Sequence, residues 1–282
     1  MTTILLPTDF SANSINAINF AVSTFKNKKC RFILLHFHMA ASVIADDLMT
    51  MGSSASIYQT LIETSKASLS KVIETLKTND NNHLHEFIPI VDYDNFVDAV
   101  NQTCKSYYAS LIIMSTNGAT GLESVIFGSN TVHLMERSNH PILAIPNKFK
   151  LVELNRWAFG VDFQMTVSKD DVKPLLELAH MTDALIDIIY VNNSDEALSS
   201  DQMVNKETLI HHFESVNHDF VVLYDENILK AISEYSDVHH CDAMALVNKK
   251  HNFLYRLLHK DNIKTFGRHI VKPILVMPCT SS

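Results

Sequence analysis

The chain has 282 residues, of which 46% are hydrophobic and 19% are charged, and its formal net charge is −8. This length suggests two domains or one large one, and the hydrophobic content excludes a disordered or fibrous protein. Because the acidic excess is spread over both halves, the sequence offers no basic face for a polyanion, and nucleic acid is not an expected partner.

The sequence predicts neither a secretory signal nor a membrane-spanning helix. Residues 1–10 lack a charged segment followed by an apolar stretch and a small-residue cleavage site. No apolar run approaches the roughly 18 residues that a membrane helix needs. The four cysteines are scattered without CxxC spacing, which is typical of free thiols in a reducing compartment. We therefore expect a cytoplasmic protein without a membrane partner.

Short apolar runs alternate with helical patterns through residues 1–146. The runs at 4–7, 31–37, 110–115 and 141–146 lack polar alternation, as strands buried on both faces do, and a further strand is expected near 87–91. Apolar spacing predicts helices after Ser11, over about 57–76, over about 96–107 and over about 129–137. This alternation predicts a doubly wound α/β sheet with helices on both faces.

The second half repeats the first. The runs at 242–247 and 273–278 mirror 110–115 and 141–146 at an offset of 273 − 141 = 132 residues, and Asp162 mirrors Asp9 at 162 − 9 = 153. Because the offset falls from 153 to 132 residues along the chain, the first half contains extra residues. We expect residues 39–56 to hold them over the carboxyl edge of the sheet. We predict two tandem Rossmann-like domains, 1–146 and 157–282, joined by a linker at 147–156.

A glycine-rich loop follows the run at 110–115. It reads STNGATGLESVIFGSN from Ser115 to Asn130, and a helix is expected to begin near Ser129. Glycine permits close backbone approach and positive φ, and a helix start offers unpaired N–H groups to an anion. Because ligands bind at the carboxyl ends of strands in such sheets, the loop predicts a polyphosphate site. An ordinary strand-to-helix connection is the alternative interpretation.

In combination, these motifs resemble the universal stress protein family. The resemblance rests on PTDFS at 7–11, LLHF at 34–37, the SxxG-x9-GS loop and PILAIP at 141–146, and it extends over essentially the whole chain as a tandem member. It implies a five-stranded parallel sheet of order 3-2-1-4-5 in each domain. It also implies an intramolecular pseudo-dimer in which the two last strands pair edge to edge, and a further homodimer is left open.

Nucleotide-binding members of the family imply roles for the matching positions. Asp9 and Phe37 would flank the adenine of ATP or another adenine nucleotide bound with Mg²⁺. The ribose and phosphates would lie against Ser115, Gly118, Gly128, Ser129 and Asn130. Ser115 stands where the family has glycine, so its Cβ would crowd the ribose or its hydroxyl would replace a backbone contact. Asp9 has an alternative interpretation as a hydrogen bonder within its loop, and Phe37 has one as a core residue.

The second domain departs from this pattern. The same 132-residue offset places Val247, Lys250, Lys260 and Asp261 opposite the first domain's Ser115, Gly118, Gly128 and Ser129. Side chains then occupy the positions of close backbone approach, and the carboxylate of Asp261 would repel a phosphate. We expect no nucleotide in the second domain, which would serve as a pseudo-symmetric partner.

The expected function is that of a cytoplasmic stress-response regulatory protein, with an adenine nucleotide in the first domain and a protein partner that the sequence does not identify. The alternatives are a nucleotide-independent interaction module or small-ligand carrier, and a slow ATPase. Glu123 is the one carboxylate between Gly118 and Ser129, and a dedicated ATPase would need further positioned charges and metal ligands. No catalytic residue is assigned. The histidine pairs at 211–212 and 239–240 lack the spacing of a metal site.

Overall fold

The structure is a computed structural model that describes residues 1–37, 54–79, 81–116, 127–147, 149–150, 152–192, 197–248 and 271–279. Within this part of the chain, no helix is both long and apolar enough to cross a membrane. Most of residues 39–56, where we expected the extra chain, lie outside the described residues.

The first half alternates strands and helices along the chain. Its strands are β1 (Thr2–Pro7), β2 (Cys30–Phe37), β3 (His85–Asp92), β4 (Leu111–Ser115) and β5 (Ile142–Ile145). Its helices are α1 (Ala12–Thr24), α3 (Ser54–Asn79), α4 (Phe96–Tyr107) and α5 (Ser129–Arg137). The predicted strands and helices of this half are all present.

The second half repeats this alternation. Its strands are β6 (Arg156–Val161), β7 (Leu185–Asn192), β8 (His218–Tyr224), β9 (Ala243–Asn248) and β10 (Ile274–Pro278). Its described helices are α6 (Lys169–Thr182), α7 (Ser200–His212) and α8 (Ile228–Val238). The first strand begins at Arg156, the last residue of the predicted linker.

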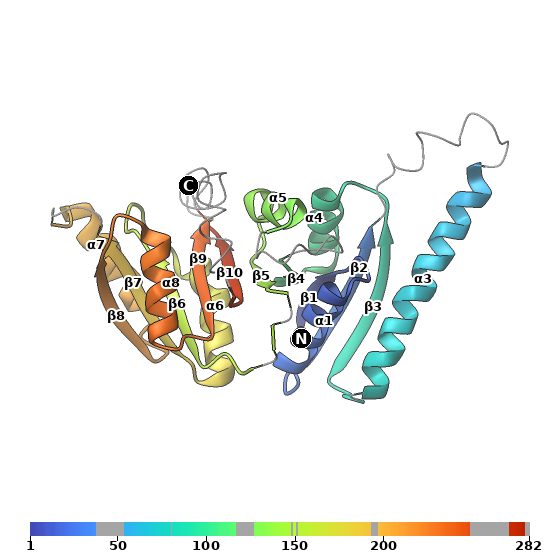
Figure 1. The fold of residues 1–282 in the computed structure, drawn as a ribbon, viewed down its shortest axis with the longest axis horizontal. Coiled ribbons are helices and arrows are strands. Elements are labelled where there is room, and N and C mark those ends of the chain that lie inside the picture. The colour runs from blue at the N-terminus through green and yellow to red at the C-terminus, as the bar shows by residue number, and fades with distance from the viewer. Residues whose placement is uncertain are drawn as a thin grey trace.

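The strands form one ten-stranded sheet of order β3-β2-β1-β4-β5-β10-β9-β6-β7-β8 (Figure 1). Pairing within each half is parallel. The halves meet where β5 and β10 pair antiparallel, with Leu143 opposite Leu275. The tandem α/β architecture is therefore confirmed, and the last strands of the two halves pair edge to edge.

Burial on both faces of the sheet explains the unbroken apolar runs. Ile4, Leu5 and Leu6 of β1 are each fully buried. One hydrophobic cluster lies under α1, α3, α6 and α7, and a second lies under α4, α5 and α8. Both clusters contain residues of both halves, so the core is continuous across the β5–β10 junction.

The described linker residues contact both halves. The ring of Phe149 lies 5.9 Å from that of Phe20, and its carbonyl accepts a hydrogen bond of 3.2 Å from the Asn16 amide. At the other end, the N–H groups of Asn155 and Arg156 donate to the Asp242 carboxylate. These contacts hold the described linker residues against both halves.

Candidate functional site

The predicted site lies at the carboxyl edge of the first half, where β1 and β4 are neighbours. These two strands pair in parallel, with Ile4 opposite Leu111, although β2 and β3 lie between them in the sequence. The chain leaves β1 toward β2 on one side and β4 lies on the other, which makes this point the topological switch of the sheet. In α/β sheets such a switch point is the usual place for a ligand.

The turn after β1 is held by hydrogen bonds from its own side chains. Thr8 is buried, and its hydroxyl accepts the N–H of Phe10 at 3.0 Å and lies 2.9 Å from the Ser14 hydroxyl. Asp9 is exposed, and its Oδ1 accepts the N–H and the O–H of Ser11 at 3.0 and 2.6 Å. Phe10 has a φ of 62°, which is strained for an L residue. Asp9 therefore stabilises a strained turn, whatever else it binds.

The second half builds the same turn. Asp162 Oδ1 accepts the N–H of Gln164 at 3.0 Å, and Phe163, which matches Phe10, has a φ of 54°. Because the bond persists in the copy whose glycine loop is replaced, part of the role of Asp9 is structural.

The end of β2 presents two aromatic side chains to opposite faces. The Phe37 ring lies 4.8 Å from the Phe96 ring and packs on the cluster under α4. The ring of His36 lies 4.4 Å from that of Phe10, and its Nδ1 lies 2.8 Å from the Thr8 carbonyl oxygen. Of these two, His36 contacts the turn that carries Asp9. The role of Phe37 beside an adenine stays a prediction, and His36 is a candidate that strand alternation could have indicated.

The start of α5 differs from the other helix starts. Ser11, Asn95, Ser168, Ser199 and Asn227 each cap their helix with a side-chain acceptor. Gly128 provides no such cap for α5, and Ser129 and Asn130 are exposed. Gly128 has a φ of −60°, so this glycine does not use the left-handed region. Among the helices whose N-cap is described, α5 alone lacks a side-chain acceptor at its N-cap, and the N–H groups of such a helix start are suited to an anion.

The end of β4 connects to α5 through backbone groups. The Thr116 carbonyl accepts the N–H of Gly128 at 2.8 Å and the hydroxyl of Thr131 at 3.0 Å. Ser115 is buried, with 7% exposure. The Thr116 hydroxyl is also buried and has no hydrogen-bond partner among the described residues. Ser115, Gly128, Ser129 and Asn130 therefore lie near one another where β4 meets α5, their role as a ligand site stays a prediction, and Gly118 is outside the described residues.

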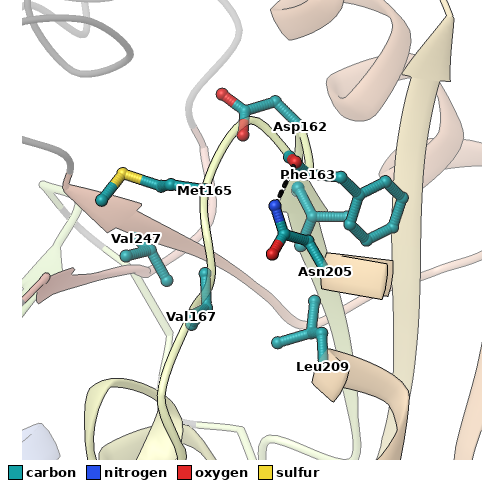
Figure 2. Close-up of a pocket in the computed structure, with 9 residues that line it drawn as sticks. Asp162, Phe163, Met165, Val167, Asn205, Leu209 and Val247 are labelled. Carbon is teal, nitrogen blue, oxygen red and sulfur yellow. Dashed lines mark hydrogen bonds between the residues drawn. The ribbon is translucent and has the colours of Figure 1, made fainter. Parts of the chain in front are cut away.

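At the matching edge of the second half, the described side chains line a small pocket. Figure 2 shows Met165 and Val247 on one side of the turn, and Asn205, which donates to the Phe163 carbonyl at 3.0 Å, on the other. The pocket among these residues has a volume of about 20 Å³, which is room for about one water. Burial, with Asp162 nearby, raises the pKa of Tyr190 behind this turn. Lys250, Lys260 and Asp261 lie outside the described residues.

The class of this protein is defined by its two doubly wound α/β units, which are joined through their last strands. The family model of the universal stress protein family matches residues 1–146. The chain belongs to that family, which places it among stress-response proteins.

Solved structures share the whole architecture. A universal stress protein from Archaeoglobus fulgidus DSM 4304 is 16% identical, with a TM-score of 0.69 over 99% of this chain and 97% of that one. A putative universal stress protein from Pseudomonas aeruginosa UCBPP-PA14 is 11% identical, with a TM-score of 0.60 over 99% and 93%. The cytoplasmic domain of a prokaryotic cation chloride cotransporter is also 11% identical, with a TM-score of 0.54 over 98% and 95%. Among curated proteins, no sequence matches this chain.

Proposed function

We propose that this protein is a cytoplasmic stress-response regulator that binds one adenine nucleotide with Mg²⁺, at the carboxyl edge of its first half. The phosphates would lie at the start of α5, against the backbone of Gly128 and the side chains of Ser129 and Asn130. The base would lie toward the turn that carries Asp9.

The uncapped start of α5 is the observation that carries this proposal. A helix start without a side-chain acceptor leaves N–H groups and a positive dipole end exposed, and phosphates bind well to such ends. Gly128 fits this role because a capping side chain at this position would bind the helix N–H groups in place of a phosphate. The buried Thr116 hydroxyl, which has no hydrogen-bond partner in the described part of the chain, adds a polar group that a ligand or its water can satisfy.

The second half would bind no nucleotide and would act as the partner of the first. Its matching edge has a pocket of about 20 Å³, whereas small-molecule sites occupy about 300–1,000 Å³. The side chains of Met165 and Val247 line this pocket, and the Asn205 amide donates a hydrogen bond to the Phe163 carbonyl beside it.

Native mass spectrometry of protein purified without added nucleotide tests the proposal directly. We expect a bound mass that matches an adenine nucleotide, or a gain of that mass when ATP and Mg²⁺ are added. An apolar bound mass would favour a small-ligand carrier instead.

Calorimetric titration with ATP and Mg²⁺ then counts the sites. We expect one site per chain, together with a higher melting temperature in saturating nucleotide. Two equivalent sites would contradict the proposal that the second half binds no nucleotide. No heat and no melting shift at millimolar nucleotide would contradict nucleotide binding by the first half.

A further inference from the structure

The ten-stranded sheet ends in two edge strands, β3 and β8, at opposite ends of the molecule (Figure 1). In the described part of the chain each has one strand neighbour, β2 for β3 and β7 for β8. An open edge presents unpaired backbone N–H and C=O groups and invites pairing with another strand. The two edges are not protected to the same degree.

The β3 edge carries features that oppose pairing. Pro89 lies in the middle of its sequence, HEFIPIVD, and proline removes a backbone donor. Glu86 adds a charge, paired with Arg31 of β2 at 2.9 Å. The 26-residue helix α3 runs beside β3 (Figure 1).

The β8 edge also carries one exposed carboxylate, that of Asp219, but it lacks the other two features. Its sequence, HDFVVLY, contains no proline, and the helix that matches α3, α7, has 13 residues instead of 26. Val222 is 41% exposed and Tyr224 is 76% exposed. Met203 and Val204 of α7 are also exposed, by 49% and 62%. In the described part of the chain, the β8 edge therefore has no second strand neighbour and carries exposed apolar side chains at Val222 and Tyr224.

Backbone bonds show which groups of this edge face outward. The Asn217 carbonyl accepts the N–H of Ile186, and the Asp225 N–H donates to Asn192. Because a strand alternates with period two, residues 219, 221 and 223 also direct their backbone groups toward β7. The N–H and C=O groups of residues 218, 220, 222 and 224 point away from the sheet.

We infer that β8 pairs with β8 of a second copy of this chain, antiparallel about a twofold axis at Val221. This register overlaps the whole strand and sets the outward groups of Phe220 opposite those of Val222, as a hydrogen-bonded pair. His218 then lies opposite Tyr224, and Asp219 lies opposite Leu223, so no like charges within β8 face each other.

A second copy is the occupant that this edge fits. The strand is complementary to itself in the one register that uses all seven residues, and such a twofold contact closes at two copies. The contact would also continue the existing sheet, whose halves already join by antiparallel edge pairing of β5 with β10.

Disulfide trapping tests both the dimer and its register. In this register Val221 is a non-hydrogen-bonded pair with itself, at a Cα separation of about 4.5 Å, which lies within disulfide range. We expect Val221→Cys, in a Cys279→Ser background, to form a covalent dimer on mild oxidation. The three other cysteines are buried and stay in place.

Leu223→Cys is the matched control on the same strand. In this register the two copies of residue 223 would lie four residues apart along the strand, about 13 Å, so this variant should form no covalent dimer on oxidation. Equal trapping of both variants, or no trapping of Val221→Cys in a chain that is dimeric, would overturn the inference.

Sedimentation velocity of the reduced full chain gives an independent readout. We expect a dimer that dissociates as the protein is diluted. Val222→Lys should lower the mass to that of a monomer, whereas Val271→Lys adds the same charge at an exposed valine beside β10 and should leave the dimer intact. The fluorescence of Trp157 reports whether each variant is folded. A wild-type monomer at every concentration, or a dimer that survives Val222→Lys, would refute the β8 contact.

Discussion

The uncapped start of α5 allows one substitution to separate helix stability from anion binding. Gly128 has φ −60° and ψ 150°, a conformation that any L residue adopts. Gly128→Asp supplies the missing cap, worth a few tenths of a kcal/mol over glycine, and a negative charge near the helix dipole, worth about 0.3–1 kcal/mol. We expect the free energy of unfolding to rise by about 0.5–1 kcal/mol.

The same carboxylate opposes a phosphate at this helix start. Two like charges about 4 Å apart repel by about 1 kcal/mol in water and about 4 kcal/mol near a protein surface. Because Ser129 and Asn130 are exposed, we take an intermediate value of about 2 kcal/mol. That value corresponds to about 30-fold weaker binding of the nucleotide.

Calorimetric titration with ATP and Mg²⁺ measures this loss, and urea unfolding measures the stability. Gly128→Asn is the matched control, because asparagine caps a helix about as well as aspartate without the charge. The affinity difference between the two variants therefore isolates the electrostatic part. Equal nucleotide affinity of the wild type and both variants would refute the placement of the phosphates at α5.

Three further predictions concern stability. Arg156→Ala leaves the fully buried Asp187 carboxylate without its bidentate partner at 2.7 and 3.2 Å. This substitution should lower the free energy of unfolding, measured with urea, by about 3 kcal/mol. As a control, Arg31→Ala breaks an exposed ion pair and should lower the same free energy by less than about 1 kcal/mol. Burial raises the pKa of the Cys104 thiol to about 12, so the unfolded chain loses this proton at a lower pH than the folded chain. The free energy of unfolding should therefore fall as the pH rises from about 9 toward 12. Cys104→Ala should make this fall less steep, and an unchanged slope would contradict the prediction. Gly160→Ala brings a Cβ to 2.6 Å from Ile232 Cδ1. This close contact should lower the melting temperature by a few degrees, equivalent to about 1–2 kcal/mol in the free energy of unfolding. An unchanged melting temperature would mean that the Ile232 side chain moves aside freely.

Local signals predicted the first half closely. The helices expected over about 96–107 and 129–137 have those bounds in the structure. Asn95 and Gly128 mark the two starts, and apolar residues recur at helical spacing after each. Strands extend by one or two residues beyond several apolar runs, because backbone pairing continues where the side chains become polar.

The second half carried weaker signals. β8 lies at the sheet edge with a mixed burial pattern, so it lacks the continuous apolar run that marks a central strand. α7 buries one described side chain, that of Leu209, and shows little periodicity as a result. An element that buries little surface has only a weak periodic pattern of apolar residues in its sequence.

The candidate site was predictable in its location but not in every side chain. The strand ends and the loop before Ser129 follow from the α/β pattern, which fixes where ligands bind. The choice between His36 and Phe37 depends on strand phase, and a difference of one residue moves a side chain to the opposite face. The family resemblance indicated only the end of the strand.

The antiparallel pairing of β5 with β10 also affects how the protein depends on its own abundance. Two separate copies would cover these edges only at concentrations above their dissociation constant. Covalent linkage through residues 147–155 converts the encounter into an intramolecular one, with an effective concentration that does not depend on expression level. The half with the candidate site therefore keeps its β5 edge covered even when few molecules are present, and the second half can lose its own site without losing this role.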